Sequence, residues 1–539
     1  MSDDLPGDIR AYHSRTKHSS RHYALGPAFL DWDSQPDPFR SFEGARRIDL
    51  PLGLDADTPP FGRLDGRPAA ALDRSGLGLF LELALGLSAW KETGDARWAL
   101  RNNPSSGNLH PTEGWVILPP LAGIGDGPGL YHYSAFHHAL EERCRLEAMP
   151  ADLPPGAFLL GLSSIVWREA WKYGERAFRY CQHDCGHALA AASYAAACLG
   201  WRVRALSGPG DEDLAALLGL DRADSCHRYE PEHPDLLALV SPLPLDEPAL
   251  IPVGGTWAGQ ANRLSEDHEV WPVIGQALRL SEKPTQPPLA SPPSVPSPSL
   301  PASAEPTASL IRRRRSAQAM DGATAMDKAA LLRLLAATLP DAARVPWSSF
   351  PWPARLALFL FVHRVEGLAP GLYALIRDPS SLERLKAACS PAFTWDEAAP
   401  GVLPLYRLAL DDYRWPSIAL SCQQSIAGRG AFSLGMVAEF DRTLEEEGQW
   451  AYRRLFWEAG ILGQVLYLEA TAAGLSGTGI GCYLDDEVHE MLGLDPDSTA
   501  WQSLYHFTVG GAVEDRRIGT SPAYAHLARA AATASRAVS

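Results

Sequence analysis

Hydrophobic and polar positions follow the same order of patterns twice along the chain. In the first half, a helical pattern at 76–92 precedes strand-like apolar runs at 115–118 and 158–162. An alanine-rich helix follows at 175–199, and because it is apolar on nearly every face, it is predicted to be buried. The second half repeats this order in the segments 327–337, 357–360, 405–410 and 450–473. Long helices mixed with strands, without a regular alternation of the two, predict an α+β fold.

Alignment of the two halves shows that one is a diverged copy of the other. A shift of 242 positions places Pro128-Gly129-Leu130-Tyr131 on Pro370-Gly371-Leu372-Tyr373. A shift of 274 aligns a longer segment without a gap, and it pairs Gly174, Arg179, Gly186, Gly200, Asp211 and Leu218-Gly219-Leu220-Asp221 with Gly448, Arg453, Gly460, Gly474, Asp485 and Leu492-Gly493-Leu494-Asp495. The chain is therefore predicted to contain two related domains in tandem.

A segment rich in Pro, Ser and Ala at residues 283–307 separates the two copies. Such a composition cannot bury a core and favours an extended polyproline conformation of ~3.1 Å per residue. The segment could thus span roughly 75 Å, which is long enough for the two halves to embrace each other. We therefore expect domains at 1–282 and 308–539, joined by a linker at 283–307.

Composition limits the classes of protein to which the chain can belong. With 539 residues and 46% hydrophobic residues, it can form two large cores. A net charge of −16 argues against a nucleic-acid-binding surface. No apolar run reaches the length of a membrane span, and the N-terminus has no apolar signal core. The eight cysteines are scattered without a CxxC pair, so we expect reduced thiols, no metal site and a cytoplasmic location.

The first half carries a polar loop, Ser105-Ser106-Gly107-Asn108, directly before an apolar strand. All four residue types form turns, so an ordinary connecting loop is one interpretation. The other is a ligand clamp, because hydroxyls and the amide supply donors and acceptors while glycine lets the backbone approach a flat ring. In the second half the aligned residues are Trp347, Ser348, Ser349 and Phe350.

The second half carries a glycine-rich turn, Gly474-Leu475-Ser476-Gly477-Thr478-Gly479-Ile480-Gly481. It follows a predicted helix rather than a strand, so it is not a Rossmann fingerprint. Its counterpart in the first half has larger side chains at most of the glycine positions and reads Gly200-Trp201-Arg202-Val203-Arg204-Ala205-Leu206-Ser207. The first half thus keeps the Ser-Ser-Gly-Asn loop and has lost the glycine-rich turn, and the second half shows the reverse.

A run of four arginines, Arg312-Arg313-Arg314-Arg315, precedes Ser316 at the start of the second half. Like charges in a row are often a solvated patch. Alternatively they form a phosphate site, because guanidinium groups bind phosphate through two parallel hydrogen bonds and serine adds a hydroxyl. Arg516-Arg517, after the last predicted strand, could complete that site.

Lys172-Tyr173 occurs only in the first half, because Glu446 and Glu447 stand at the aligned positions. One interpretation is a surface pair at the start of a helix. The other is proton transfer, since a lysine in an apolar cleft can shift its own pKa or that of a neighbouring phenol.

In their order, these motifs resemble the nitroreductase superfamily of flavoenzymes. The matching segments are Arg-x-Ser at 314–316, the Pro-Ser-Ser-Gly-Asn run with the following Leu-His-Pro-Thr-Glu at 104–113, Gly-Leu-Tyr at 129–131 and the glycine-rich turn. Within the superfamily, Arg176-Ala177-Phe178-Arg179-Tyr180 and Asn108-Leu109-His110-Pro111-Thr112-Glu113 are most similar to SagB-type or McbC-like dehydrogenases, as is Tyr12-His13 with Thr16-Lys17. Such dehydrogenases oxidise thiazoline and oxazoline rings in modified peptides to thiazoles and oxazoles.

The resemblance implies two nitroreductase-like domains, each a mixed or antiparallel sheet flanked by helices, that form an intramolecular pseudo-dimer. Family members are intertwined homodimers that bind FMN between subunits, so a fused pair would have two unequal sites. The site that the resemblance completes has cofactor contacts from Ser105, Ser106, Asn108, Arg314, Ser316, Gly477, Gly479 and Arg516, with Lys172 and Tyr173 as acid–base residues. Gln318 stands where the family has a further basic contact. The other site, with Trp347, Ser349 and Phe350, is expected to bind no FMN.

The expected function is an FMN-dependent dehydrogenase that acts on azoline rings of a modified peptide or a small molecule. The sequence shows no recognisable cyclase domain, so a separate cyclodehydratase partner would have to make the ring. An NAD(P)H-dependent reductase of nitro compounds or quinones is the alternative within enzymes, although it would not need Lys172-Tyr173. A non-catalytic scaffold that docks a modified peptide is the alternative of another class.

Overall fold

The first half is built around an antiparallel sheet with the strand order β11-β7-β6-β5-β8-β10-β9, in which β2 also pairs with β7. The computed structural model describes residues 5–64, 66–244, 246–290, 295, 298, 300 and 303–527. The strands of this sheet are β2 (Arg46–Asp49), β5 (Thr112–Leu118), β6 (Gly129–Ser134), β7 (Ala139–Leu146), β8 (Phe158–Ile165), β9 (Arg202–Ala205), β10 (Glu232–Ser241) and β11 (Gly255–Trp257).

The second half forms its own antiparallel sheet with the order β17-β18-β16-β14-β19-β21-β20. Its strands are β14 (Leu356–Val362), β16 (Gly371–Leu375), β17 (Asp396–Glu397), β18 (Leu405–Ala409), β19 (Phe432–Glu439), β20 (Ser476–Ile480) and β21 (Trp501–Gly510). The order β16-β14-β19-β21-β20 repeats the order β6-β5-β8-β10-β9 of the first sheet. The predicted α+β fold with one antiparallel sheet in each copy is thus confirmed.

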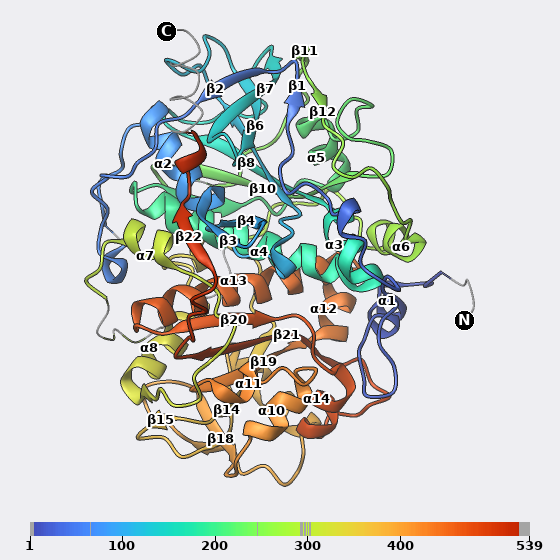
Figure 1. The fold of residues 1–539 in the computed structure, drawn as a ribbon, viewed down its shortest axis with the longest axis vertical. Helices are drawn as coiled ribbons and strands as arrows, with labels where there is room; N and C mark the ends of the chain where they lie inside the picture. Colours follow the sequence, from blue (N-terminus) through green and yellow to red (C-terminus); the bar gives the residue numbers. More distant parts are fainter. Residues whose placement is uncertain are drawn as a thin grey trace.

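Two long buried helices, α4 (Ala177–Ala197) and α13 (Ala451–Ala472), lie side by side between the two sheets (Figure 1). They cross at a pair of glycines. A Cβ atom on Gly186 would lie 2.1 Å from the carbonyl oxygen of Trp457, and one on Gly460 would lie 2.1 Å from that of His183. Both relations follow the 274-residue shift, so the crossing point lies on a local twofold axis between the copies. Only glycine allows the two backbones to approach this closely.

The two copies also exchange charged side chains across this axis. Arg179 in the first copy pairs with Asp485 in the second at 3.0 Å, and Arg453 in the second pairs with Asp211 in the first at 2.5 Å. All four residues are aligned by the shift of 274. The halves therefore interlock as a pseudo-dimer, in the way that the repeat predicted.

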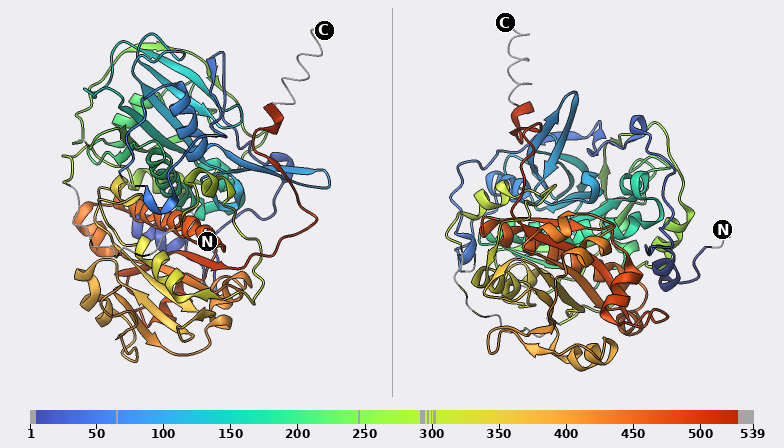
Figure 2. Two further views of the ribbon diagram at one scale, coloured as in Figure 1. Left: turned by 90° about the vertical axis from the view of Figure 1, so that its left-hand side faces the viewer. Right: turned by 60° about the horizontal axis from the view of Figure 1, so that its bottom comes forward.

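The last described residues of the second half cross back to the first half. Strand β22 (Gly519–Pro522) pairs with β3 (Leu87–Thr93), which in turn pairs with β4 (Ala96–Arg101) in a three-stranded sheet. Figure 2 shows this red segment leaving the second half and running along the first. Nothing in the sequence pattern predicted this crossover. The helix predicted over 76–92 was partly wrong as well, because α2 (Arg74–Leu85) ends before Gly86 and Leu87 already begins β3.

The shorter elements complete the two copies. The remaining strands pair as β1 (Phe42–Glu43) with β12 (Gln260–Ala261) and β13 (Met326–Asp327) with β15 (Val365–Glu366). The remaining helices are α1 (Ile9–Arg15), α3 (Val166–Tyr173), α5 (Asp211–Leu218), α6 (Pro272–Leu280), α7 (Thr307–Arg313), α8 (Lys328–Ala337), α9 (Leu382–Ala388), α10 (Arg414–Leu420), α11 (Ile426–Arg429), α12 (Phe440–Glu447) and α14 (Asp485–Leu492). None of the described helices combines the length and the apolar character of a membrane-spanning helix.

Helix α6, which precedes the Pro-rich segment, makes contacts that correspond to those of α1 in the other copy. The hydroxyl of Thr16 after α1 donates to the carbonyls of Tyr12 and His13, and the hydroxyl of Ser281 after α6 donates to those of Ala277 and Leu278. The carbonyl of His18 accepts from the amide of Asp485, and the carbonyl of Lys283 accepts from that of Asp211. We therefore propose that the second copy begins near α6, within the residues 1–282 assigned to the first domain and earlier than the start expected at 308. Most of residues 291–302 lie outside the described part of the chain.

Candidate functional site

Arg314, at the C-terminal end of α7, is a buried cation with no acidic partner among the described residues. Its side chain is 3% exposed and makes one hydrogen bond, from Nη2 to the carbonyl of Arg101 at 3.0 Å. Its Nε and Nη1 atoms are buried without a partner among the described residues, and its guanidinium group lies 5.0 Å from the centroid of the Tyr467 ring. Burial lowers the pKa of Arg314, and burial also lowers the pKa of Arg315 to about 10. Because buried charges are normally paired, two free guanidinium nitrogens indicate an anion site.

Tyr467 on α13 connects Ser316 to the glycine-rich turn. Its hydroxyl accepts from the hydroxyl of Ser316 at 3.0 Å and from the amide of Gly479 at 2.9 Å. Ser316 also pairs with Gly477 in an isolated parallel bridge. The structure thus brings together four of the predicted cofactor contacts: Arg314, Ser316, Gly477 and Gly479.

The structure explains why glycine occupies these positions of β20, and the sequence could not show this reason. A Cβ atom on Gly477 would lie 2.6 Å from the Phe507 ring, and one on Gly479 would lie 1.9 Å from the hydroxyl of Tyr505. Both rings belong to the neighbouring strand β21. The glycines therefore make room for aromatic side chains, and their contact with a cofactor stays a prediction.

The polar loop of the first half forms the short 3-10 helix η3 (Ser106–Asn108) beside Tyr173. Gly107 has a φ of +60°, and a Cβ atom there would lie 2.6 Å from the hydroxyl of Tyr173. Asn108 also has a positive φ, and its amide group is used locally. It donates to the carbonyl of Ala99 at 2.8 Å and lies 3.0 Å from Nε2 of His110. Ser105 accepts from the amide of His110 at 2.8 Å, so the loop is held rigidly.

Two buried carboxyl groups, Glu169 on α3 and Asp184 on α4, lie behind this loop and were missed from the sequence. The hydroxyl of Ser105 is 3.5 Å from Glu169, and the amide of Ser106 donates to Asp184 at 3.2 Å. Each carboxyl group keeps one buried oxygen without a partner among the described residues. Burial raises the pKa of Asp184 to about 7, while burial and the neighbouring Asp184 raise the pKa of Glu169 well above its usual value. Perturbed groups of this kind cluster at functional sites.

The second copy neutralises the equivalent carboxylate. Glu458, at the position of Asp184 after the shift of 274, forms a fully buried ion pair with Arg377. The shift of 242 places Ala135 of the first copy at the position of Arg377. The first copy has therefore kept the acid and lost the cation, which leaves a proton-binding group in its site.

The Tyr173 hydroxyl holds its proton in this environment, and the acid–base role expected for it stays a prediction. Burial, followed by the nearby Glu169, raises its pKa well above 10, so its hydroxyl stays protonated at neutral pH. The nitrogen of Lys172 lies 5.4 Å from the centroid of the Tyr173 ring. Tyr180 packs edge-on against Tyr173 at 4.6 Å and donates to the carbonyl of Gly481 at 3.1 Å. Tyr173 thereby connects the loop of one copy to the turn of the other.

Arg516, the remaining predicted contact, lies apart from these contacts. Its side chain is exposed and makes no hydrogen bond or ion pair with any described residue, whereas Arg517 pairs with Asp515 at 2.7 Å. Its role at a phosphate stays a prediction.

The equivalent region on the other side of the local axis is more closed. The 3-10 helix η5 (Trp347–Ser349) packs directly on β9, whereas η3 does not pack on β20 to the same extent. A cavity of about 260 Å³ remains there, with Trp201, Pro242 and Ser348 in its lining. Pro242 stands at the position of Arg516, and Ser193 at that of Tyr467. This side has proline and serine where the first site has Arg516 and Tyr467, and Arg67 and Arg202 also line its cavity.

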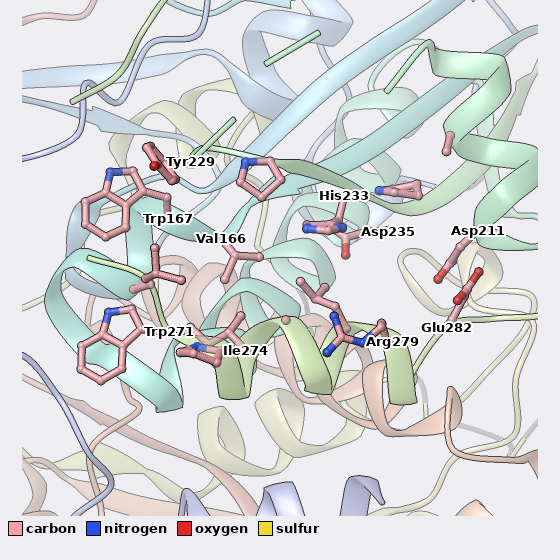
Figure 3. Close-up of a pocket in the computed structure, with 18 of the residues that line it drawn as sticks. Val166, Trp167, Asp211, Tyr229, His233, Asp235, Trp271, Ile274, Arg279 and Glu282 are labelled. Atoms are coloured by element: carbon pink, nitrogen blue, oxygen red, sulfur yellow. The ribbon is translucent and has the colours of Figure 1, made fainter. Parts of the chain in front are cut away.

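A larger cavity of about 650 Å³ lies around the Asp211–Arg453 ion pair and was not predicted. Figure 3 shows its two ends, with the rings of Trp167, Tyr229 and Trp271 at one and the carboxylates of Asp211 and Glu282 at the other. It lies at the pseudo-dimer interface beside Asp211–Arg453, whereas the equivalent pair Arg179–Asp485 lies on the other side of the local axis. It therefore does not coincide with the site around Tyr173 and Arg314.

The fold and the site define a two-copy α+β protein with a polar site between the copies, and comparisons place it among known families. Residues 311–511 match the model of the nitroreductase family, so the chain contains a nitroreductase-family domain. Comparison with the curated proteins returns no match. A putative nitroreductase from Anabaena variabilis aligns over 94% of this chain and 100% of its own, with a TM-score of 0.70 and 21% identity. The nitroreductase fold thus extends over both halves.

Two further solved structures each cover less than half of this chain. A putative nitroreductase from Ralstonia eutropha covers 42% of this chain and 89% of its own, at 18% identity and a TM-score of 0.27. A chain of the E. coli microcin synthetase McbBCD complex with truncated pro-MccB17 bound covers 38% of this chain and 70% of its own, at 19% identity and a TM-score of 0.28.

Proposed function

We propose that the chain is an FMN-dependent oxidoreductase with one flavin site between its two copies. The observation that carries the proposal is the buried Arg314, whose guanidinium group has two nitrogens without a partner among the described residues and lies over the ring of Tyr467, which bonds Ser316 and Gly479. These groups suit the phosphate of FMN, and the loop at η3 with Tyr173 would lie beside its ring. The nitroreductase-family domain over residues 311–511 supports the cofactor.

Within this class, we propose a dehydrogenase that oxidises azoline rings of a modified peptide, or of a small molecule, to azoles. A bound flavin would supply the hydride acceptor. The hydroxyl of Tyr173 would donate a hydrogen bond to the substrate, and Lys172 would lie beside the substrate's proton-releasing atom. The carboxyl groups of Glu169 and Asp184 would take up and return that proton, because the pKa of Asp184 lies near neutral pH. A cyclodehydratase would supply the ring.

Purified protein saturated with FMN is expected to bind about one flavin per chain. The reason is that the second site has Pro242, Ser193 and Phe350 where the first has Arg516, Tyr467 and Asn108. Flavin released by heat and quantified by absorbance against polypeptide concentration gives the ratio. A ratio near two would show that the second site also binds, and no retained flavin would overturn the assignment of the cofactor.

Tyr173→Phe is expected to lower turnover of an azoline-containing peptide about 10²-fold while leaving flavin content unchanged. The ring and its packing on Tyr180 remain, and only the hydroxyl is lost. The effect lies at the lower end of the range for acid–base residues because Glu169 and Asp184 still hold a proton.

A matched control is Tyr373→Phe, which removes a hydroxyl bonded to the carbonyl of Ala369 in the second copy. It should leave turnover within about twofold, since it is remote from the proposed chemistry. If Tyr173→Phe keeps full azoline turnover, the pair has no role in proton transfer. If the wild-type protein instead reduces a nitroarene with NAD(P)H and leaves azolines unchanged, the nitro or quinone reductase alternative holds.

A further inference from the structure

Two cysteines of the second copy, Cys422 and Cys482, lie in sulfur–sulfur contact. Their Sγ atoms are 2.8 Å apart, and both residues are half-buried, so reagents in solution can reach them. Cys422 lies in the loop between α10 and α11, and Cys482 is the second residue after β20. Gly208 stands at the position of Cys482 in the first copy. The pair therefore occurs only beside the candidate flavin site.

His18, from the N-terminal segment, polarises Cys482. Its Nδ1 atom accepts from the amide of Ala24 at 3.0 Å, so the neutral ring carries its proton on Nε2 and can donate to the Cys482 sulfur. The backbone of His18 is fixed, because its amide and carbonyl bond the side chain and the amide of Asp485 at 2.9 and 2.7 Å. Hydrogen bonds from Cys422 and then His18 lower the pKa of Cys482 to about 5, against the effect of burial.

The loop that carries Cys422 is held in a conformation that side chains disfavour. Cys422 has a φ of +52° and Gln423 a φ of +61°, each in the left-handed region. Such backbone is energetically unfavourable for residues other than glycine and persists where the surroundings enforce it. Here the side chain of Gln424 donates to the carbonyl of Cys482 at 3.0 Å, which ties the loop to the second cysteine.

We propose that Cys422 and Cys482 are a redox-active dithiol–disulfide pair that exchanges two electrons with small disulfides and dithiols. The Cys482 thiolate attacks one sulfur of the external disulfide, which forms a mixed disulfide and releases one thiolate. The thiol of Cys422 then loses its proton and attacks the Cys482 sulfur, which releases the second external thiol. Two cysteine thiols are oxidised, and one disulfide is reduced to two thiols.

Cys482 directly follows Gly481, whose carbonyl group belongs to the candidate site. The carbonyl of Gly481, next to Cys482, accepts from the hydroxyl of Tyr180 at 3.1 Å and from Nη2 of Arg176 at 3.2 Å. Tyr180 in turn packs against Tyr173. Formation of the disulfide would therefore act on the segment that positions Tyr173, although the thiol chemistry itself requires no flavin.

The test equilibrates the native full-length protein in buffers of reduced and oxidised dithiothreitol, quenches with acid and alkylates the free thiols. We expect intact mass to show the loss of two of the eight thiols over one redox transition, and peptide mapping to show a link between Cys422 and Cys482. Cys226→Ser, which removes another half-buried thiol, should retain the transition. Cys482→Ser should abolish it. Eight free thiols in the fully oxidised buffer, or a link between other cysteines, would overturn the proposal.

The rate of alkylation provides a second measurement that needs no disulfide. At pH 7, iodoacetamide should modify Cys482 about tenfold faster than Cys226, because the thiolate is the nucleophile and its intrinsic reactivity falls only partly as the pKa falls. His18→Ala should remove most of this difference. Equal rates at the two cysteines in the wild-type protein would show that Cys482 is not activated.

Discussion

Replacement of Arg314 by Met is expected to weaken FMN binding about 10³-fold, which corresponds to about 4 kcal/mol. The same change should stabilise the flavin-free protein. Arg314 is buried, and within the described part of the chain its side chain makes one hydrogen bond and leaves two nitrogens without a partner, so the flavin-free protein bears the cost of an unpaired buried charge. Met has a similar length and no charge.

Opposite effects on binding and on stability distinguish a ligand-binding arginine from a structural one. Affinity is measured by fluorescence titration of FMN, and stability by thermal unfolding without flavin. Arg313→Met is the matched control, because Arg313 is exposed, pairs with Glu305 at 2.6 Å and should affect affinity by about twofold or less. An Arg314→Met protein that binds FMN normally would remove the phosphate site from this position.

The four consecutive arginines show where sequence reasoning reached its limit. Their pattern predicted either a solvated patch or a phosphate site, and the structure shows that they differ from one another. Arg312 pairs with Glu82, Arg313 pairs with Glu305, and Arg314 alone is buried without an acid. Which arginine faces the interior depends on how α7 packs against α13 and α2, and a run of identical residues carries no information about that.

The repeat predicted the fold better than local patterns did. Shared glycines at 186 and 460, and shared ion-pair residues, indicated two similar copies, and the structure places the glycines at the axis between them and relates the two ion pairs by it. The strand β22 could not be predicted, because four residues of mixed character become a strand only when they meet β3 of the other copy. The same holds for the end of α2, where Leu87 continues the apolar pattern as a strand.

The site was predicted in outline from the residues that differ between the copies. Lys172, Tyr173 and the loop at η3 are close together, as the pattern indicated. Glu169 and Asp184 were missed because an acid within a helical pattern is usually a solvent-facing residue, and only packing shows that these two are buried. Cys422 and Cys482, sixty residues apart, formed no recognisable spacing and meet only through the fold.

Asp184→Asn and Glu458→Gln are expected to change stability in opposite directions, although the two acids occupy equivalent positions. The folded pKa of Asp184, about 7, lies above the unfolded value of about 3.9, so the folded protein holds more protons between these values. Stability therefore falls as pH rises from about 4 to about 7, and the full cost of the charge is present above pH 7. Asn has no charge to bury, and its amide oxygen can still accept from the amide of Ser106.

Asp184→Asn should accordingly raise the free energy of unfolding at pH 8 by about 1–2 kcal/mol and leave it nearly unchanged at pH 4. Glu458→Gln should lower it at pH 8 by about 3–5 kcal/mol, because it leaves Arg377 buried without its carboxylate. Urea unfolding of the flavin-free proteins at both pH values measures the differences. If Asp184→Asn destabilises the protein at pH 8 as much as Glu458→Gln does, Asp184 is a paired structural acid. The proton-holding role proposed for it would then be lost, because a carboxylate already stabilised by a partner would not titrate near neutral pH.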